Sequence, residues 1–195
     1  MPYIFAATAS APFGLMPVEG VVPAPTNAYV VGTSAGAIQI GDVVVLGTDG
    51  RVQVAASGLI SVAGTGVTTV IGVAAEGLDA SPAAGTEILV YDDPDQIFVI
   101  QDDGNAAGGI QATGVGSIGL TFGFSATAGG TALNRSGMVL KGTSGSTAQT
   151  LPFKILGQHR VEGGGTGLIT AGSGTFTRWR VKFNPASHLL QGGAI

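Results

Sequence analysis

The sequence predicts an all-β protein, a small β-barrel or β-sandwich of β-tulip-like or jelly-roll-like architecture. Short β-prone runs are separated by turn signals roughly every eight to twelve residues, which is typical of sandwiches and barrels. No window keeps apolar residues at helical spacing without an interrupting glycine or β-branched residue. The chain of 195 residues holds 34 glycines, and only 10% of its residues are charged, so the helix-favouring Glu and Lys are scarce.

Two β-hairpins are expected. The first joins strands at 40–47 and 51–56 across Thr48-Asp49-Gly50, because an Asp-Gly pair favours a tight hairpin turn. The second joins strands at 87–91 and 96–101 across the acidic turn Asp92-Asp93-Pro94-Asp95. The remaining strands are expected at 28–31, 59–62, 68–75, 118–124, 138–141, 152–156 and 176–183.

Residues 1–25 differ from the rest of the chain. Five prolines lie among scattered apolar side chains in this segment, and proline disfavours both a helix and a central strand. We expect an extended arm that lies on a partner, and an ordered strap along its own domain is the alternative. Residues 26–195 are expected to form a single all-β domain with long glycine-rich loops.

The last predicted strand alternates cleanly between two kinds of side chain. Its first face holds Arg178, Arg180 and Lys182, and its second face is mostly apolar, with Trp179 among its residues. Successive side chains of a strand point to opposite faces of the sheet. The cations are therefore expected to face solvent or a partner, and Trp179 is expected to face the core.

Charge is distributed unevenly along the chain. Residues 1–133 hold eleven acidic residues and one basic residue, Arg51, whereas residues 134–195 hold seven basic residues and one acidic residue, Glu162. Spatial segregation of these charges would favour contacts between copies or docking on a charged partner. Alternatively, the two halves interleave in one domain and neutralise each other. The sequence leaves both outcomes open.

The composition excludes several classes of protein. The hydrophobic fraction is 45%, unlike that of a disordered chain, which is poor in apolar residues. The chain has no cysteine, so it forms no disulfide and no thiolate metal site. No apolar run approaches the ~18 residues that span a membrane, and the N-terminus lacks the basic start of a signal peptide. We expect synthesis in a cytoplasm and no membrane partner.

No metal site is predicted. The carboxylates of Asp92, Asp93, Asp95, Asp102 and Asp103 are the type of ligand that calcium prefers, but their spacing matches no calcium loop. Proline and Asp-Gly pairs suit tight, exposed turns, so solvated turns are favoured. Neither histidine, at 159 or 188, has a partner at metal-ligand spacing, and both are expected at the surface or at an interface.

No catalytic residue or cofactor site is predicted either. The glycine-rich segments at 114–119 and 163–167 open no predicted helix, so they lack the dipole that favours phosphate binding. No Gly-x-Ser-x-Gly elbow is present, and the protein is not expected to be an enzyme. The run Arg178-Trp179-Arg180 could grip a nucleic acid. However, Trp179 alternates away from the arginines and the pI is about 4.9, so a nucleic-acid partner is not expected.

Several fragments together resemble a family of small structural proteins, the capsid cement or decoration proteins of tailed bacteriophages. These fragments extend from about residue 30 to residue 185, and they include neither residues 1–25 nor the tail after Asn184. They are Ile40-Gly-Asp-Val-Val-Val-Leu with Asp49-Gly-Arg-Val, Ile71-Gly-Val-Ala-Ala, Val90-Tyr-Asp-Asp-Pro-Asp-Gln-Ile-Phe, Arg135-Ser-Gly-Met, Leu151-Pro-Phe-Lys-Ile-Leu-Gly and Arg180-Val-Lys-Phe-Asn-Pro.

The resemblance implies a non-enzymatic virion protein without a cofactor. It would lie on the outer surface of an expanded icosahedral phage head and bridge neighbouring major capsid subunits. Its partners would be the major capsid protein and other copies of itself, for example in a trimer around local threefold positions. A receptor- or glycan-binding β module of a phage fibre or adhesin is the alternative. One Trp and three Tyr offer little aromatic surface for that role.

Three groups of residues are expected to contact the capsid. The first is an apolar anchor in the arm, the second an acidic turn, and the third a basic strand. They consist of Tyr3, Phe5, Phe13, Leu15 and Met16; of Asp92, Asp93 and Asp95; and of Arg178, Arg180 and Lys182.

Overall fold

The computed structural model describes residues 13–18, 26–32, 36–55, 70–79, 82–104, 114–125, 135–147, 151–159 and 177–188. These residues form strands and three short 3₁₀ turns and contain no α-helix, which confirms the all-β prediction. The strands are β1 (Met16–Pro17), β2 (Thr26–Val30), β3 (Val43–Leu46), β4 (Val52–Val54), β5 (Val70–Ala74), β6 (Glu87–Tyr91), β7 (Phe98–Gln101), β8 (Thr121–Phe122), β9 (Phe124–Ser125), β10 (Val139–Leu140), β11 (Phe153–Gln158) and β12 (Arg178–Phe183). The 3₁₀ turns are η1 (Gly114–Ser117), η2 (Gly142–Ser144) and η3 (Pro185–Ser187).

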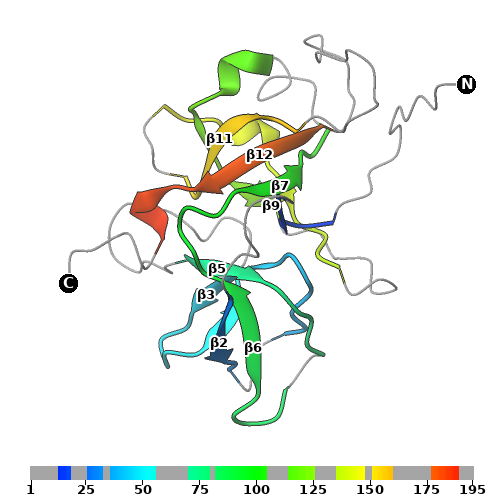
Figure 1. The fold of residues 1–195 in the computed structure, drawn as a ribbon, viewed down its shortest axis with the longest axis vertical. Helices are drawn as coiled ribbons and strands as arrows, with labels where there is room; N and C mark the ends of the chain where they lie inside the picture. Colours follow the sequence, from blue (N-terminus) through cyan, green and yellow to red (C-terminus); the bar gives the residue numbers. More distant parts are fainter. Residues whose placement is uncertain are drawn as a thin grey trace, which may run out of the picture.

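The strands form two five-stranded sheets, one above the other in Figure 1. The upper sheet has the order β1-β7-β12-β11-β8, and the lower sheet has the order β2-β6-β5-β3-β4. The short pair β9–β10 lies beside β7. Every strand pair is antiparallel.

The two sheets share one hydrophobic core. Aromatic side chains of the upper sheet, including Phe98, Phe153 and Phe183, pack with valines of the lower sheet such as Val43 and Val73. The Phe183 ring lies 5.6 Å from the Phe98 ring and 5.3 Å from the Phe153 ring, measured between centroids. Full burial of such a side chain stabilises the fold by about 1.5–3 kcal/mol. The arrangement is sandwich-like.

The central strands β3 and β5 of the lower sheet are buried on both faces. Away from the shared core they pack on a separate cluster that includes Val31, Ile38, Val44 and Ile71. Burial on both sides explains why β3 and β5 are continuous apolar runs, whereas β6 alternates between buried and exposed residues. The edge strands β2 and β4 approach at one end, where Val31 and Val52 form a single parallel bridge. Across the described ranges the sheet curls but does not close into a barrel.

The first predicted hairpin is confirmed. Strands β3 and β4 pair across Thr48-Asp49-Gly50, with Leu46 opposite Val52. The Gly50 N–H donates to the Gly47 carbonyl at 3.0 Å, and Gly50 has a φ of +71°, which glycine adopts without strain. The predicted strand at 59–62 lies outside the described residues.

The second predicted hairpin is wrong, although both of its strands exist. Strand β6 lies between β2 and β5 in the lower sheet, whereas β7 lies between β1 and β12 in the upper sheet. Residues 92–97 therefore carry the chain from one sheet to the other. The residues Asp92-Asp93-Pro94-Asp95 suit both a hairpin turn and a connection between two sheets. The connection forms because β6 pairs with β2 and β5, whereas β7 pairs with β1 and β12.

Residues 13–18 pack along their own domain. Met16 pairs with Val99 of β7, and the Val18 N–H donates to the Ile97 carbonyl at 3.0 Å. Leu15 is only 1% exposed and lies in the shared core. For these residues the ordered strap is correct, and the free arm is not. The arm predicted for residues 1–12 and 19–25 lies outside the described residues.

The strap fits because two glycines meet at its crossing with the segment before β3. Gly14 has a φ of +68°, and a Cβ there would lie 2.4 Å from the Ser136 Cβ. Gly41 has a φ of +88°, and a Cβ there would lie 2.9 Å from the Phe13 carbonyl oxygen. Both positions therefore require glycine.

The cations are concentrated on the upper sheet, whereas carboxylates occur at both sheets, since Asp95 and Asp102 contact β12. The described cations of the upper sheet and its adjoining segments are Arg135, Lys141, Lys154, Arg178, Arg180 and Lys182. The described carboxylates of the lower sheet and its turns are Asp42, Asp49, Glu76, Asp79 and Glu87, with Arg51 as the described cation there. The two halves of the chain nevertheless interleave, because β7 of the first half lies between β1 and β12 in the upper sheet. Asp95 of the acidic half pairs with Lys182 of β12, so part of the charge is neutralised within the chain.

Candidate functional site

Strand β12 presents cations on one side and core residues on the other. Trp179, Val181 and Phe183 are fully buried, whereas Arg178 and Arg180 are exposed. Lys182 is partly exposed, with 31% of its side chain accessible. This confirms the alternation expected from the sequence.

A buried carboxylate holds the inner side of this strand. The Trp179 Nε1–H donates to Asp102 Oδ2 at 3.0 Å. The Thr177 and Gly104 N–H groups donate to Asp102 Oδ1 at 3.0 and 3.1 Å. Asp102 is fully buried, so the prediction that it lies in an exposed turn is wrong. The N–H of a buried tryptophan needs a hydrogen-bond acceptor. Since the sequence places Trp179 in the core, this requirement could have indicated that a nearby carboxylate such as Asp102 is buried with it.

Asp92 is also buried and is not available to a partner. It is 3% exposed and accepts hydrogen bonds from the Tyr29 hydroxyl at 2.6 Å and from Asn27 Nδ2 at 2.7 Å. Burial, together with the bond to Asp92 and its charge, raises the pKa of Tyr29 to about 12. Asp92 and Leu15 were both expected to contact a capsid, but their burial leaves them inaccessible to a partner.

The rest of the acidic turn lies close to the basic strand. Asp93 Oδ1 accepts the Asp95 N–H at 2.8 Å, which fixes the turn. Asp95 is 72% exposed, and its Oδ1 lies 3.5 Å from Lys182 Nζ. An exposed pair of this kind stabilises a protein by about 0–1 kcal/mol. The acidic turn and the basic strand thus meet within one chain.

The outer face of β11 and β12 carries unbalanced positive charge. The strand register places Lys154 opposite Lys182, and Arg180 lies between Gly157 and Val99. Like charges directly opposite each other in a sheet are destabilising. Within the described ranges, Arg180 and Lys154 have no carboxylate at ion-pair distance. We call Lys154, Arg180 and Lys182 the cationic row.

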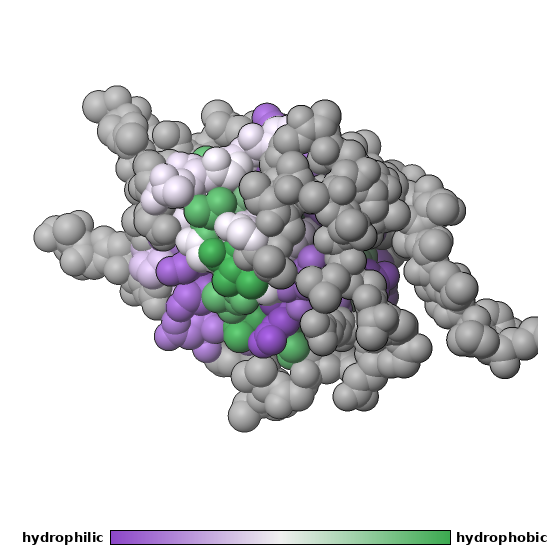
Figure 2. All heavy atoms as spheres, turned by 90° about the horizontal axis from the view of Figure 1, so that it is seen from above, coloured by the Kyte–Doolittle hydropathy of each residue, from purple (hydrophilic) through white to green (hydrophobic). Residues whose placement is uncertain are grey.

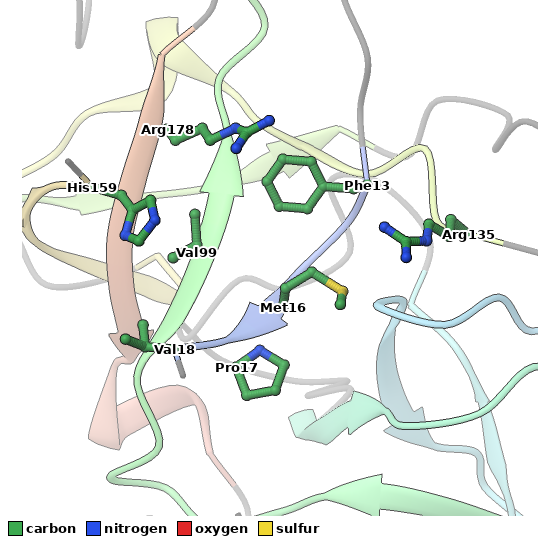
Figure 3. Close-up of a pocket in the computed structure, with 8 residues that line it drawn as sticks. All are labelled: Phe13, Met16, Pro17, Val18, Val99, Arg135, His159 and Arg178. Carbon is green, nitrogen blue, oxygen red and sulfur yellow. The ribbon is translucent and has the colours of Figure 1, made fainter. Parts of the chain in front are cut away.

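A groove of about 320 Å³ lies beside this row, between the strap and the upper sheet. In Figure 3 the side chains of Arg178 and Arg135 flank the Phe13 ring, and the Arg178 Cζ lies 5.0 Å from the centre of that ring. The surface seen from above in Figure 2 shows a stripe of hydrophobic residues beside hydrophilic ones. The groove is lined by Phe13, Met16, Pro17, Val18, Val99, Arg135, His159 and Arg178.

The pKa of His159 is affected by the positive charge of this groove. Its pKa lies below the usual value, chiefly because the imidazole is partly buried and then because Arg178 and Arg180 repel its charged form. Of the predicted apolar anchor, Phe13 and Met16 line the groove. Tyr3 and Phe5 lie outside the described residues.

The described acidic residues, the glycine-rich segment at 114–119 and His188 form no metal or phosphate site within the described residues. The described residues contain no group of three side chains placed to hold a metal ion. The first four residues of the glycine-rich segment at 114–119 form the 3₁₀ turn η1 (Gly114–Ser117). The prediction that His188 lies at the surface or at an interface is wrong, because it is fully buried with its ring 5.1 Å from that of Phe183. None of the described helical turns is long and apolar enough to cross a bilayer.

Comparison with known proteins returns no relative: no protein-family model, no curated protein and no solved structure matches the chain.

Proposed function

We propose that this chain is a virion structural protein, a capsid cement or decoration protein that binds the outer surface of a tailed-phage head. The observation that carries the proposal is the cationic row on the outer face of β11 and β12. Two of the fragments that resemble decoration proteins, at 151–157 and 180–185, form these neighbouring strands. The row lacks enough carboxylates of its own, so an acidic protein surface would complement it.

The proposed mechanism is mechanical. The row lies on a sheet whose other face is packed with aromatic residues, so the strands that bear its cations are held in place. Each exposed charge pair contributes about 0–1 kcal/mol, but a copy that bridges two capsid subunits adds buried area across their seam. Many copies on one head then act together. The finer features of the proposal are a β-tulip-like or jelly-roll-like fold, glycine-rich loops, and an arm in which Tyr3 and Phe5 anchor the protein.

Binding to emptied heads of the phage that carries this gene tests the proposal. The triple variant Lys154→Gln/Arg180→Gln/Lys182→Gln should bind at least about tenfold more weakly, because several charge pairs are lost together. Lys141→Gln is the matched control, since Lys141 is an exposed cation outside the row. Unchanged binding of the triple variant would remove the cationic row from the mechanism.

The arm is tested separately. Deletion of residues 2–12 removes Tyr3 and Phe5 but leaves Leu15 and Met16 in place, which belong to the folded domain. We expect weaker binding to heads with an unchanged midpoint of urea unfolding. Undiminished binding would show that the arm is not an anchor.

The rival function, a receptor- or glycan-binding module, receives less support. Trp179 is fully buried, and the Tyr29 hydroxyl is engaged by Asp92. These side chains therefore offer no aromatic platform for a sugar. Binding on a glycan array that survives loss of the cationic row would favour this rival.

A further inference from the structure

A second exposed apolar surface lies on the lower sheet, at strands β2 and β6. Val30 and Leu89 are 40% and 41% exposed, which is high for large aliphatic residues in strands. Val30 lies opposite Glu87, which is exposed. The Leu89 N–H donates to Glu76 Oε1 at 2.8 Å, so this carboxylate is held beside Leu89. We call Val30, Glu76, Glu87 and Leu89 the acidic patch.

The groove of the upper sheet has the inverse chemistry. Phe13, Met16 and Val99 give it an apolar lining, and Arg135 and Arg178 give it positive charge. No described carboxylate lies at ion-pair distance from either arginine. Its volume of about 320 Å³ is at the lower end of small-ligand pockets, about 300–1,000 Å³. A groove of this kind suits an aliphatic side chain accompanied by a carboxylate.

The edge of the strap excludes one common mode of docking. An incoming strand would need free N–H groups along β1. Pro17 has no N–H, and the Leu15 N–H already donates to the Gly41 carbonyl at 2.9 Å. Proline on an edge strand is a known protection against strand addition. The occupant of the groove must therefore bind through side chains.

We infer that the groove of one copy receives the acidic patch of a second copy. Leu89 or Val30 would enter the apolar part of the groove, and Glu87 and Glu76 would approach Arg135 and Arg178. The local charges support this occupant, because each chain presents Glu76 and Glu87 on the acidic patch and Arg135 and Arg178 in the groove, and so contains both halves of the contact. The contact is distinct from the cationic row, and its existence does not depend on binding to a capsid.

Self-association of the purified full chain tests this inference by sedimentation velocity over a range of concentrations. The wild type should associate, and salt should weaken the association because the pairs are partly exposed. Arg135→Glu reverses one charge of the groove, and Glu87→Arg reverses one charge of the patch. Each variant alone should associate at least about tenfold more weakly. Lys141→Glu, outside both surfaces, should associate like the wild type.

The decisive sample is an equal mixture of the two variants. The Glu87→Arg chain keeps an unaltered groove, and the Arg135→Glu chain keeps an unaltered patch. Mixed pairs should therefore form with wild-type affinity although neither variant associates alone. Arg135→Gln and Glu87→Gln replace them if a reversal prevents folding, as judged by circular dichroism. The NMR titration of His159 adds a local readout, since an arriving carboxylate should raise its pKa.

Three results would overturn the inference. The first is a wild type that stays monomeric at all attainable concentrations, and the second is a mixture that fails to associate. The third is a monomeric protein whose groove binds an acidic peptide or an oligonucleotide and loses it in Arg135→Glu, because another anion would then be the occupant. Binding of the same variants to phage heads is measured in parallel. Because the capsid proposal rests on the cationic row, it can hold or fail independently of self-association through the groove.

Discussion

At the scale of single residues, Asp102 connects segments that lie far apart in the sequence. Its carboxylate connects the end of β7 with Trp179, which lies 77 positions away in the sequence. It also accepts the N–H of Thr177, just before β12, and the N–H of Gly104, two residues after Asp102 itself. A buried carboxylate in this setting orders the strand that bears the cationic row.

Replacing Asp102 by Ala should therefore destabilise the protein by about 3 kcal/mol, because the buried Trp179 N–H and two partly buried backbone N–H groups lose their acceptor. Urea unfolding measures this change. Asp95→Ala is the matched control, since its exposed ion pair contributes about 0–1 kcal/mol. Equal effects of the two substitutions would contradict a structural role for Asp102.

Gly72 offers a second test at this scale. A Cβ at this position would lie 2.1 Å from the Tyr91 carbonyl oxygen, because β5 runs close to the backbone of β6. Gly72→Ala should destabilise the protein by more than about 3 kcal/mol, since backbone atoms would have to move. At Gly36 a Cβ would meet nothing within 4 Å, so Gly36→Ala should be neutral or slightly stabilising in the same unfolding measurement.

At the scale of elements, the sequence predicts strands well and their pairing poorly. The alternation of β12 and the Asp-Gly turn of β3–β4 are local signals, and both are confirmed. The course of the chain after β6 is decided by contacts that no local pattern contains. Asp92 is held by Asn27 and Tyr29, which lie 65 and 63 positions away.

The candidate site shows the same division. The outward direction of Arg178, Arg180 and Lys182 follows from the strand period alone. The burial of Leu15 and Asp92 depends on the crossing of the strap and on the β2–β6 pairing, which the sequence does not specify. The groove was not predicted, because its residues come from five separate segments of the chain.

The segment after β12 gives a prediction about pH. His188 forms a parallel bridge with Val70 of β5. Burial lowers the pKa of His188, while a backbone hydrogen bond with Ile71 and the charges of Asp92 and Asp93 act in the opposite direction. The folded-state pKa lies below the unfolded value of about 6.5, so the unfolded chain binds the proton more readily.

Stability should therefore be fully present above pH ~6.5 and should fall as the pH drops below that value. Urea unfolding between neutral and mildly acidic pH measures this loss, and His188→Gln should reduce it. His159→Gln is the control for the half-buried histidine of the groove, whose pKa is also lowered. A stability that rises on acidification through this window would contradict the buried position of His188.

At the scale of the whole molecule, the shared core couples the two sheets. Val43, Val45, Val70 and Val73 of the lower sheet belong to the same cluster as Trp179 of the upper sheet. Neither sheet can lose this contact without exposing apolar surface of the other. The described parts of the protein should therefore unfold as one cooperative unit.

The single tryptophan makes this prediction simple to check. Trp179 fluorescence reports the upper sheet, and far-ultraviolet circular dichroism reports strands of both sheets. The two signals should follow one coincident transition in urea. Two separate transitions would show that the lower sheet is an independent domain.

The order of the strands also indicates how this fold could change in evolution. The lower sheet consists of the consecutive strands β2 to β6 and is thus an insertion between β1 and β7. The chain leaves the upper sheet at Val18 and returns at Ile97, and a 3.0 Å hydrogen bond joins these two residues. We expect that another sheet with a comparable apolar face can be grafted between them, which retained burial of Trp179 would verify. The module that bears the cationic row can then stay constant while its inserted neighbour is exchanged.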